Sequence, residues 1–152
     1  KTFRLTRFYG YSARNRRSDS WDLLRACRPY SLEPWCCTGD FNDMLTPADK
    51  RGVHAHPEQL LAGFQQAVSD CNLKEVSMQG YLYTWSKWLG QPECVEERLD
   101  WAFTNPEMRE RFHKISPTNL VAPRSYWKSS IYHQLGWPAC LNSRTVGGIE
   151  LS

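Results

Sequence analysis

Apolar and polar positions follow two different periods along the first half of the chain. Residues 3–9 carry apolar and aromatic side chains in a short run that ends at Gly10, which predicts a strand. Residues 18–27, with a cap at Ser18 or Asp19, have the apolar spacing of a helix, and Pro29 ends it. The clearest helix is expected over residues 57–71, where six apolar residues form one stripe.

The remaining segments are shorter and suggest a mixed fold. A helix is expected to begin at Asn105-Pro106, since asparagine caps helices and proline suits the first turn. A long loop is expected over residues 46–56. Further strands are predicted at residues 34–38, 73–76, 81–85, 98–103 and 115–121. This alternation of strands and helices predicts the α+β class.

Length and composition agree with one packed domain. The chain has 152 residues, of which 41% are hydrophobic and 23% charged, so a core can form and wholesale disorder is not expected. No apolar run approaches the roughly 20 residues that a membrane helix needs. We therefore expect no membrane-spanning segment.

The net charge of +3 is small, but its distribution is uneven. The basic residues among positions 1–28 are Lys1, Arg4, Arg7, Arg14, Arg16, Arg17, Arg25 and Arg28, against Asp19 and Asp22. Such a leading segment, with Arg7 beside aromatic residues, can lie along phosphates. A solvated face of one strand and one helix explains the same charges.

Six cysteines raise the question of disulfides. Cys36 and Cys37 are adjacent in an apolar run, Cys27 and Cys71 fall on apolar helical faces, and no C-x-x-C pair occurs. Buried, reduced thiols are the better interpretation, which favours an intracellular location over a disulfide-rich secreted module.

Asp40 and Asn42 are the main candidates for chemistry. They follow a buried strand. Side chains two residues apart on an extended segment point to the same side, so Asp40 and Asn42 are expected to face one site. A carboxylate can orient an attacking water molecule and accept its proton. A carboxamide can donate a hydrogen bond to a phosphate oxygen. The same G-D-x-N sequence is also a common turn.

Other polar and aromatic residues add to this candidate site. Asp100 lies within an apolar strand, where an unpaired carboxylate is costly, so it needs a metal, a histidine or Arg98 as its partner, unless it faces water on an edge strand. Thr84 and Trp85 follow a turn and can present a hydroxyl and a stacking plane to nucleic acid. The phenol of Tyr9 can bind a phosphate.

The histidines show no metal-site pattern. His54 and His56 lack a third ligand at metal spacing, so both are interpreted as loop histidines, and we assign no metal ligand.

Several motifs occur in one order along the chain. They are Phe8-Tyr-Gly-Tyr, Trp35-Cys-Cys-Thr-Gly-Asp-Phe-Asn-Asp, Lys50-Arg-Gly, Gly80-Tyr-Leu-Tyr-Thr-Trp and Glu97-Arg-Leu-Asp. Together they resemble the endonuclease/exonuclease/phosphatase superfamily, and most of all the endonuclease domains of plant non-LTR (LINE-type) retrotransposons. The resemblance covers residues 1–121, and residues 122–152 form a divergent tail.

The resemblance implies a fold and a chemistry. The fold is a four-layer α/β-sandwich, in which two packed β-sheets are flanked by helices. The activity is Mg²⁺-dependent hydrolysis of DNA phosphodiester bonds, with a reverse transcriptase region elsewhere in the parent element. Asp40 takes the water-orienting or base role, Asn42 contacts the phosphate, Tyr9 matches the active-site tyrosine, and Asp100 supports the site.

The same resemblance assigns the contacts to nucleic acid. Trp85 matches the family's aromatic strand near the bound nucleic acid. The candidate contacts to DNA are Arg7, Thr84, Trp85 and Arg98.

Two departures from the family pattern affect activity. The chain starts after the family's first Asn and its metal-binding Glu, so we expect a partial sandwich that lacks the N-terminal strands. The S-D-H motif is replaced by the sequence of residues 122–130.

Two hypotheses therefore stay open. One is a Mg²⁺-dependent endonuclease domain, impaired or inactive in this chain. The other is a non-enzymatic retroelement remnant that at most binds nucleic acid. Either protein is expected inside the cell, with the nucleus as a candidate compartment.

Overall fold

The structure is a computed structural model that describes residues 2–119 and the backbone of residues 131–132. Its helices and strands occur in this order: β1 (Arg4–Tyr9), α1 (Arg17–Cys27), β2 (Trp35–Asp40), β3 (Lys50–Arg51), α2 (Glu58–Asp70), β4 (Lys74–Glu75), β5 (Gln79–Gly80), β6 (Trp85–Lys87), β7 (Val95–Glu97), β8 (Asp100–Thr104), α3 (Pro106–Arg111), β9 (Thr118–Asn119) and β10 (Ile131–Tyr132). Short 3-10 helices cover Arg14–Arg16 and Pro47–Asp49.

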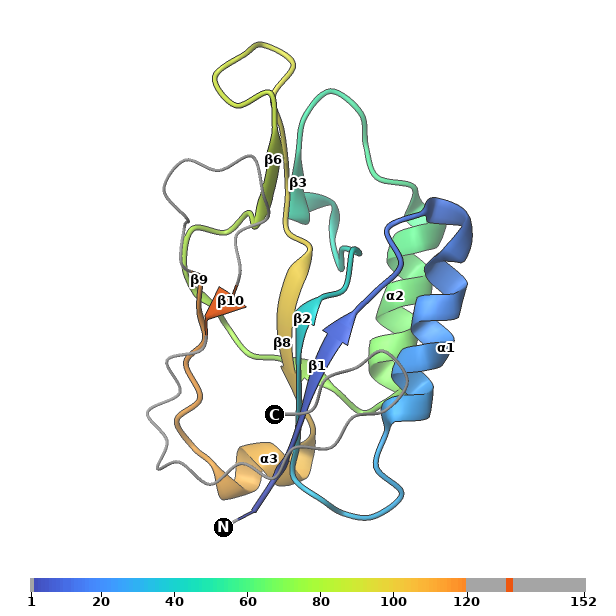
Figure 1. Cartoon of the computed structure of the whole chain (residues 1–152), viewed down its shortest axis with the longest axis vertical. Helices are drawn as coiled ribbons and strands as arrows, with labels where there is room; N and C mark the ends of the chain where they lie inside the picture. The colour runs from blue at the N-terminus through green and yellow to red at the C-terminus, as the bar shows by residue number, and fades with distance from the viewer. Residues whose placement is uncertain (1, 120–130, 133–152) are drawn as a thin grey trace.

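The described strands pair into one larger sheet and two small ones. The four-stranded sheet has the order β1-β2-β8-β4, in which β1 is parallel to β2 and the other pairs are antiparallel. The three-stranded sheets have the orders β10-β9-β5 and β3-β7-β6. Figure 1 shows the larger sheet at the centre of the molecule.

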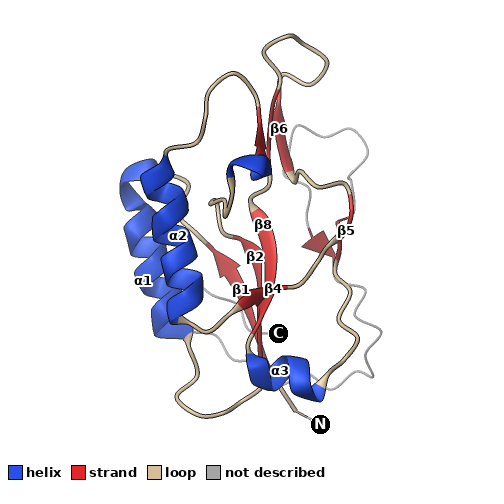
Figure 2. Ribbon diagram, turned by 180° about the vertical axis from the view of Figure 1, so that it is seen from behind, coloured by secondary structure: helices blue, strands red, loops and turns tan. Residues whose placement is uncertain are grey.

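Helices α1 and α2 lie side by side against one face of the larger sheet, as both views show (Figures 1 and 2). The main core lies between these layers and is rich in aromatic rings: Phe41 stacks on Phe8 with ring centroids 4.6 Å apart and meets Phe103 edge-on at 5.1 Å. The mixture of helices and sheets confirms the α+β class. Within the described residues, no helix is long and apolar enough to cross a bilayer.

Most of the longer elements match the sequence predictions. Asn105 caps α3 as expected, since its side-chain oxygen accepts a hydrogen bond from the Met108 amide at 3.0 Å. Helix α1 instead begins at Arg17, so Ser18 and Asp19 lie in its first turn rather than at the cap.

Some short elements differ from the predictions. The expected loop at 46–56 contains a 3-10 helix and β3. Of residues 81–85, only Trp85 lies in a strand. The proposed boundary after residue 121 and the tail at 122–152 fall outside the described residues, apart from β10.

Candidate functional site

Three of the predicted site residues lie in one row across the larger sheet. The β1–β2 register places Tyr9 opposite Asp40, and the β2–β8 register places Asp100 opposite Asp40. Residues directly opposite each other project to the same face, with Cβ atoms about 5 Å apart. Their chain neighbours Phe8 and Trp101 belong to the core beneath the helices, so this row lies on the other face.

The members of this row differ in exposure. Asp40 and Asp100 are 6% and 5% exposed, whereas Tyr9, on the edge strand, is 61% exposed. The row therefore joins two buried carboxyl groups to one accessible phenol.

The turn after β2 is built around Asp40 and Asn42. The backbone amide of Asn42 donates a hydrogen bond to Oδ1 of Asp40 at 2.9 Å. The side-chain Nδ2 of Asn42 donates to the Gly10 carbonyl at 2.7 Å. Asn42 has a φ of 53°, a left-handed conformation that asparagine tolerates better than most residues. This side chain thus ties the turn to the end of β1.

Gly39 allows β1 and β2 to approach closely before this turn. Its φ is 140°, and a Cβ at this position would lie 2.2 Å from the carbonyl oxygen of Phe8. Any other residue would push β1 away or strain the backbone. The glycine of the G-D-F-N motif therefore sets the spacing between Tyr9 and Asp40.

Thr84 holds the segment that leads into Asp100. Its hydroxyl oxygen accepts hydrogen bonds from the amides of Leu99 and Asp100 at 3.0 and 3.1 Å. Thr84 is only 2% exposed. The predicted contact between this hydroxyl and nucleic acid does not fit its burial, and the structure instead gives Thr84 a positioning role.

Arg98 is likewise engaged inside the protein. Its guanidinium forms an ion pair with Glu75, lies 3.9 Å from an Asp49 oxygen, and packs 4.0 Å from the ring centroid of Trp101. Arg98 is buried, so the predicted direct contact with nucleic acid does not fit its position either. It neutralises acidic groups beneath the strand that carries Asp100.

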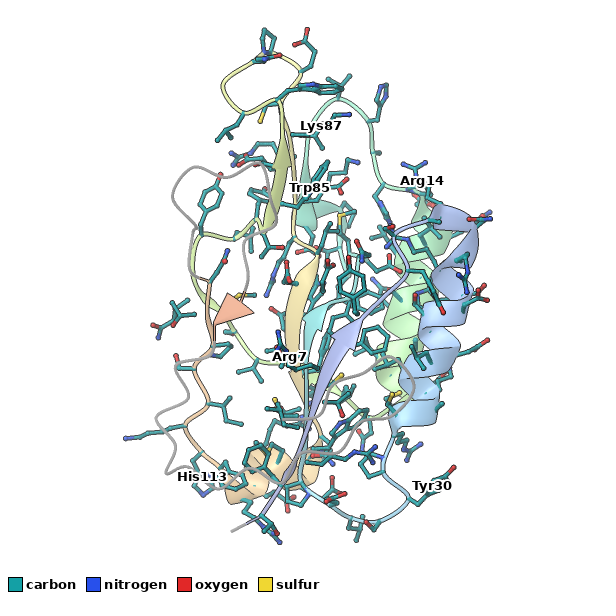
Figure 3. The ribbon with its side chains drawn as sticks, in the orientation of Figure 1. Arg7, Arg14, Tyr30, Trp85, Lys87 and His113 are labelled. Atoms are coloured by element: carbon teal, nitrogen blue, oxygen red, sulfur yellow. The ribbon has the colours of Figure 1, made fainter. Side chains whose placement is uncertain are left out.

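The other two candidate nucleic-acid contacts remain accessible. Arg7 is exposed on β1, two residues before Tyr9 and on the same face. Trp85 is half-buried on β6, where it packs against Met44, Leu61 and Leu99. Figure 3 shows Trp85 and Lys87 on β6 and Arg7 on β1.

An exposed aromatic residue that the sequence did not single out lies near Trp85. Trp88 is 49% exposed, and the Lys87 ammonium lies 4.0 Å from the centroid of its ring. The sequence did contain a signal for an exposed aromatic residue here, because Trp88 lies three residues after Trp85 and beside a turn at Gly90-Gln-Pro92.

A second group of polar residues, which sequence reasoning missed, surrounds Asp43. The Trp21 indole donates to Oδ2 of Asp43 at 2.8 Å, and the Trp101 indole donates to its carbonyl oxygen at 2.8 Å. His56, interpreted from sequence as a loop histidine, does lie in a loop but is buried, with Nε2 3.7 Å from Oδ1 of Asp43. No periodic pattern marks His56 in the sequence, since its burial depends on a distant segment.

The thiols of β2 are poor nucleophiles. Complete burial raises the pKa of Cys36 to about 12 and that of Cys37 well above its ordinary value. Cys27, Cys36, Cys37 and Cys71 are free and buried, in line with the expectation of reduced thiols. These thiols therefore stay protonated and unreactive near neutral pH.

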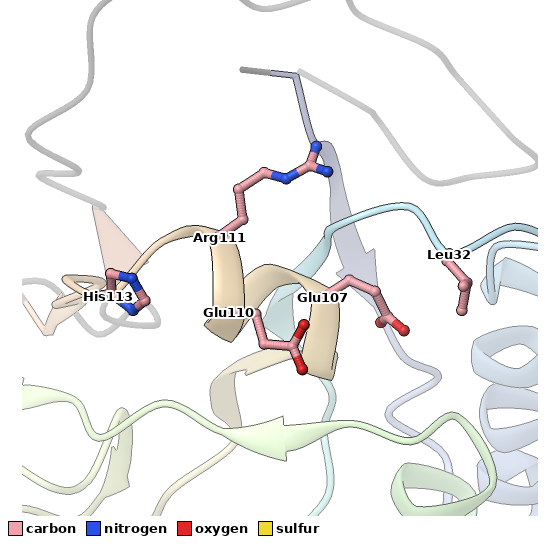
Figure 4. Close-up of a pocket in the computed structure, with 5 residues that line it drawn as sticks. All are labelled: Leu32, Glu107, Glu110, Arg111 and His113. Atoms are coloured by element: carbon pink, nitrogen blue, oxygen red, sulfur yellow. The ribbon is translucent and has the colours of Figure 1, made fainter.

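An open pocket lies at the opposite end of β8, around α3 (Figure 4). It is lined by Leu32, Glu107, Glu110, Arg111 and His113. None of the residues predicted for the candidate site lines it. Among the described residues, no three histidine, cysteine or acidic side chains converge in a way that could hold a metal ion.

Comparison with known proteins leaves the family resemblance a prediction. No family model matches the chain, and no curated protein matches it. A crystal structure of a beta toxin from Staphylococcus aureus is similar, with 14% sequence identity and a TM-score of 0.45. The match covers 84% of this chain and 47% of the toxin chain, so the chain spans about half the length of that protein.

Proposed function

We propose that this chain is a phosphodiester-directed domain of the endonuclease/exonuclease/phosphatase type, of retroelement origin. Its ancestral reaction is hydrolysis of DNA phosphodiester bonds, and this chain retains that activity weakly or not at all. One observation supports the proposal above the others: Tyr9, Asp40 and Asp100 occupy one row of the sheet through the registers of β1, β2 and β8.

This row offers the groups that phosphoryl transfer needs. Asp40 accepts a proton from the attacking water and aims it, and the exposed Tyr9 hydroxyl binds a phosphate oxygen. Asp100 supports the site from the neighbouring strand. Asn42, fixed by its bonds to Asp40 and Gly10, contributes its carboxamide beside them.

A magnesium ion at this row would be held by few protein ligands. Mg²⁺ is commonly bound through one or two carboxylates together with water and substrate phosphate. Asp100 would supply one such carboxylate, while Asp40 acts on the attacking water; among the described residues no third histidine, cysteine or acidic side chain joins them. When bound, the ion polarises the phosphoryl oxygen and offsets the charge that develops there.

Impaired activity follows from the departures in sequence. The motif that supplies the family's Asp-His pair finds no counterpart at residues 122–130. Loss of a single preorganised group commonly costs about 10²–10³ in rate. Loss of both the Asp and the His of this pair predicts a rate close to background.

A non-enzymatic function is the second candidate, and the accessible cations and aromatic rings favour it. Arg7, Tyr9 and Trp88 are exposed. Arginine contacts phosphates and aromatic rings stack on bases. The chain would then bind DNA without cleaving it, and the reverse transcriptase region of a parent element remains a proposed partner.

A plasmid-nicking assay with Mg²⁺ separates the two functions. The chain is compared with Asp40→Asn, which keeps size but removes the base, and with Asp22→Asn, an exposed control of the same chemistry on α1. Weak metal-dependent nicking that is lost only in Asp40→Asn supports the enzyme. Nicking that survives in Asp40→Asn refutes the assigned role of this residue.

DNA binding measured at several salt concentrations tests the second function. If the chain binds without nicking, log K should fall linearly with log[salt], and Arg7→Gln should reduce that slope by about one unit. Absence of binding by the intact chain contradicts the non-enzymatic function.

A further inference from the structure

Helices α1 and α2 run parallel and begin at the same end of the molecule. Trp21 near the start of α1 packs against Gly63 of α2, where a Cβ would lie 2.2 Å from Cη2 of the indole. Near their other ends, Nε of Arg25 donates to Oδ2 of Asp70 at 2.8 Å. Figures 1 and 2 show both helices starting at the same end.

Neither helix start has a side-chain cap. Arg16 precedes α1 and Pro57 precedes α2, and neither accepts a capping hydrogen bond from the first turn. The first amides of a helix need partners from outside the helix, and its dipole places roughly half a positive charge there. The Arg17 amide already donates to the Arg14 carbonyl of the preceding 3-10 helix, and both helices direct their positive ends to the same end of the parallel pair.

Arg17, the first residue of α1, has donors without acceptors. It is nine-tenths buried, and only Nη2 donates, to the Ser12 carbonyl at 3.1 Å. Its Nε and Nη1 have no hydrogen-bond partner in the part of the chain that the structure describes. Burial lowers the pKa of this guanidinium, against the attraction of Asp43 foremost and of Glu97 and Asp40.

His56, next to the start of α2, is in the same condition. Its side chain is 4% exposed, and within the described residues neither ring nitrogen has a hydrogen-bond partner. Its nearest charged neighbour is Asp43, whose Oδ1 at 3.7 Å is too far for a hydrogen bond.

The oxygens of Asp43 are already committed to other donors. Oδ2 accepts from the Trp21 indole at 2.8 Å and Oδ1 from the Met44 amide at 3.2 Å. Asp43 thus supplies a balancing charge to Arg17 but leaves the donors of Arg17 and of the His56 ring unmatched. Buried donors of this kind are rare and call for an acceptor.

We propose that Arg17 and His56, between the starts of α1 and α2, form a binding site for a phosphoryl oxyanion. Arg17 and the two helix ends exceed the charge of the Asp43 carboxylate alone by about one unit, and Glu97 and Asp40 also attract the guanidinium. Guanidinium donors and helix N-termini are the groups that proteins use for phosphate.

The site lies beside the row that contains Asp40. Asp43 is three residues from Asp40, in the same turn. The inference deepens the proposed function, since it assigns a contact to the phosphate of the same substrate. Its ligand can be the DNA backbone or free phosphate, which share this chemistry.

Entry of the oxyanion requires a local shift, because the unmatched nitrogens are buried. His56 belongs to the connection between β3 and α2, in which residues 52–55 are exposed. A movement of this connection uncovers the imidazole without disturbing the sheet. We therefore expect a weak site that saturates at millimolar phosphate.

Thermal unfolding in sodium phosphate, with chloride at matched ionic strength, tests the site. At a phosphate concentration ten times the Kd, the specific rise in Tm should be roughly 3–6 °C. Phosphate also stabilises proteins by exclusion from their surface. The decisive quantity is thus the difference in Tm rise between the intact chain and its variants.

The variants are matched in charge. Arg17→Gln should abolish the specific rise, whereas Arg111→Gln, which removes an equal charge from the exposed end of α3, should leave it unchanged. His56→Gln should lower the affinity for phosphate several-fold. An equal rise in Arg17→Gln and Arg111→Gln overturns the proposal.

Further arms keep the test decisive if Arg17→Gln fails to fold. An unchanged rise in His56→Gln then overturns the proposal by itself. Dimethyl phosphate, a diester monoanion, should replace inorganic phosphate if the DNA backbone is the ligand. Asp40→Asn should keep the phosphate effect although it lacks nicking activity, so failure of the proposed hydrolysis and failure of this site give different results.

Discussion

Replacing Thr84 with valine removes one buried oxygen atom at nearly constant volume. That oxygen accepts hydrogen bonds from the amides of Leu99 and Asp100, and both amides lie inside the protein. A buried donor left without a partner costs about 1–3 kcal/mol, so two such donors predict a loss of roughly 2–6 kcal/mol. Total stabilities of domains are about 5–15 kcal/mol, which makes this a large fraction.

Thr104→Val is a matched control on the strand that begins at Asp100. Thr104 is as buried as Thr84, but its hydroxyl has no hydrogen-bond partner among the described residues. Its replacement should therefore be neutral or stabilising by about 1 kcal/mol, because an unsatisfied polar atom is removed.

Urea unfolding, followed by circular dichroism, measures both variants. Thr84→Ser, which keeps the acceptor, should recover most of the stability that Thr84→Val loses. If Thr84→Val and Thr104→Val change the free energy of unfolding equally, the assigned role of the Thr84 hydroxyl is wrong.

Three further predictions concern β2, its turn and α1. Gly39→Ala should destabilise the fold by more than about 2 kcal/mol and widen the β1–β2 spacing, which a loss of amide protection in β1 by hydrogen exchange would reveal. Because burial raises the pKa of Cys36 to about 12, the folded state holds this proton more tightly, so stability is full below about pH 9 and falls above it. The loss should reach about 1.4 kcal/mol per pH unit up to pH 12, and Cys36→Ala should weaken this dependence in thermal unfolding. Trp21→Phe should cost about 1–3 kcal/mol in urea unfolding through loss of the donor to Asp43, whereas an unchanged midpoint would contradict that bond's contribution.

Local pattern was sufficient for the elements whose stability is largely local. The apolar stripe of α2 and the asparagine before α3 predicted both helices, because periodicity and capping depend on neighbouring residues. Strands β3 and β7 show the opposite case. They exist because Lys50 pairs with Glu97 across 47 positions, a contact that no local window contains.

The candidate site divides in the same way. Asp40 and Asn42 stand out in the sequence because a Gly-Asp-x-Asn turn sequence follows an apolar run, but their geometry depends on the register between strands. Thr84 illustrates the difficulty. A hydroxyl beside a turn suggests exposure, whereas the structure turns it inward to accept two amides of the strand that carries Asp100.

Arg17 and His56, at the starts of α1 and α2, and Thr104 on β8 all have buried polar atoms without a hydrogen-bond partner among the described residues, but the free-energy cost of burying them differs. A buried hydroxyl without a partner costs about 1–3 kcal/mol, which packing can offset at Thr104. A buried guanidinium stays charged, so the two unmatched donors of Arg17 carry a much larger penalty, which a domain of ordinary stability bears only with compensation. Asp43 offsets the charge but not the hydrogen bonds. An acceptor supplies the remaining compensation, and the proposed oxyanion is such an acceptor beside the turn that follows Asp40.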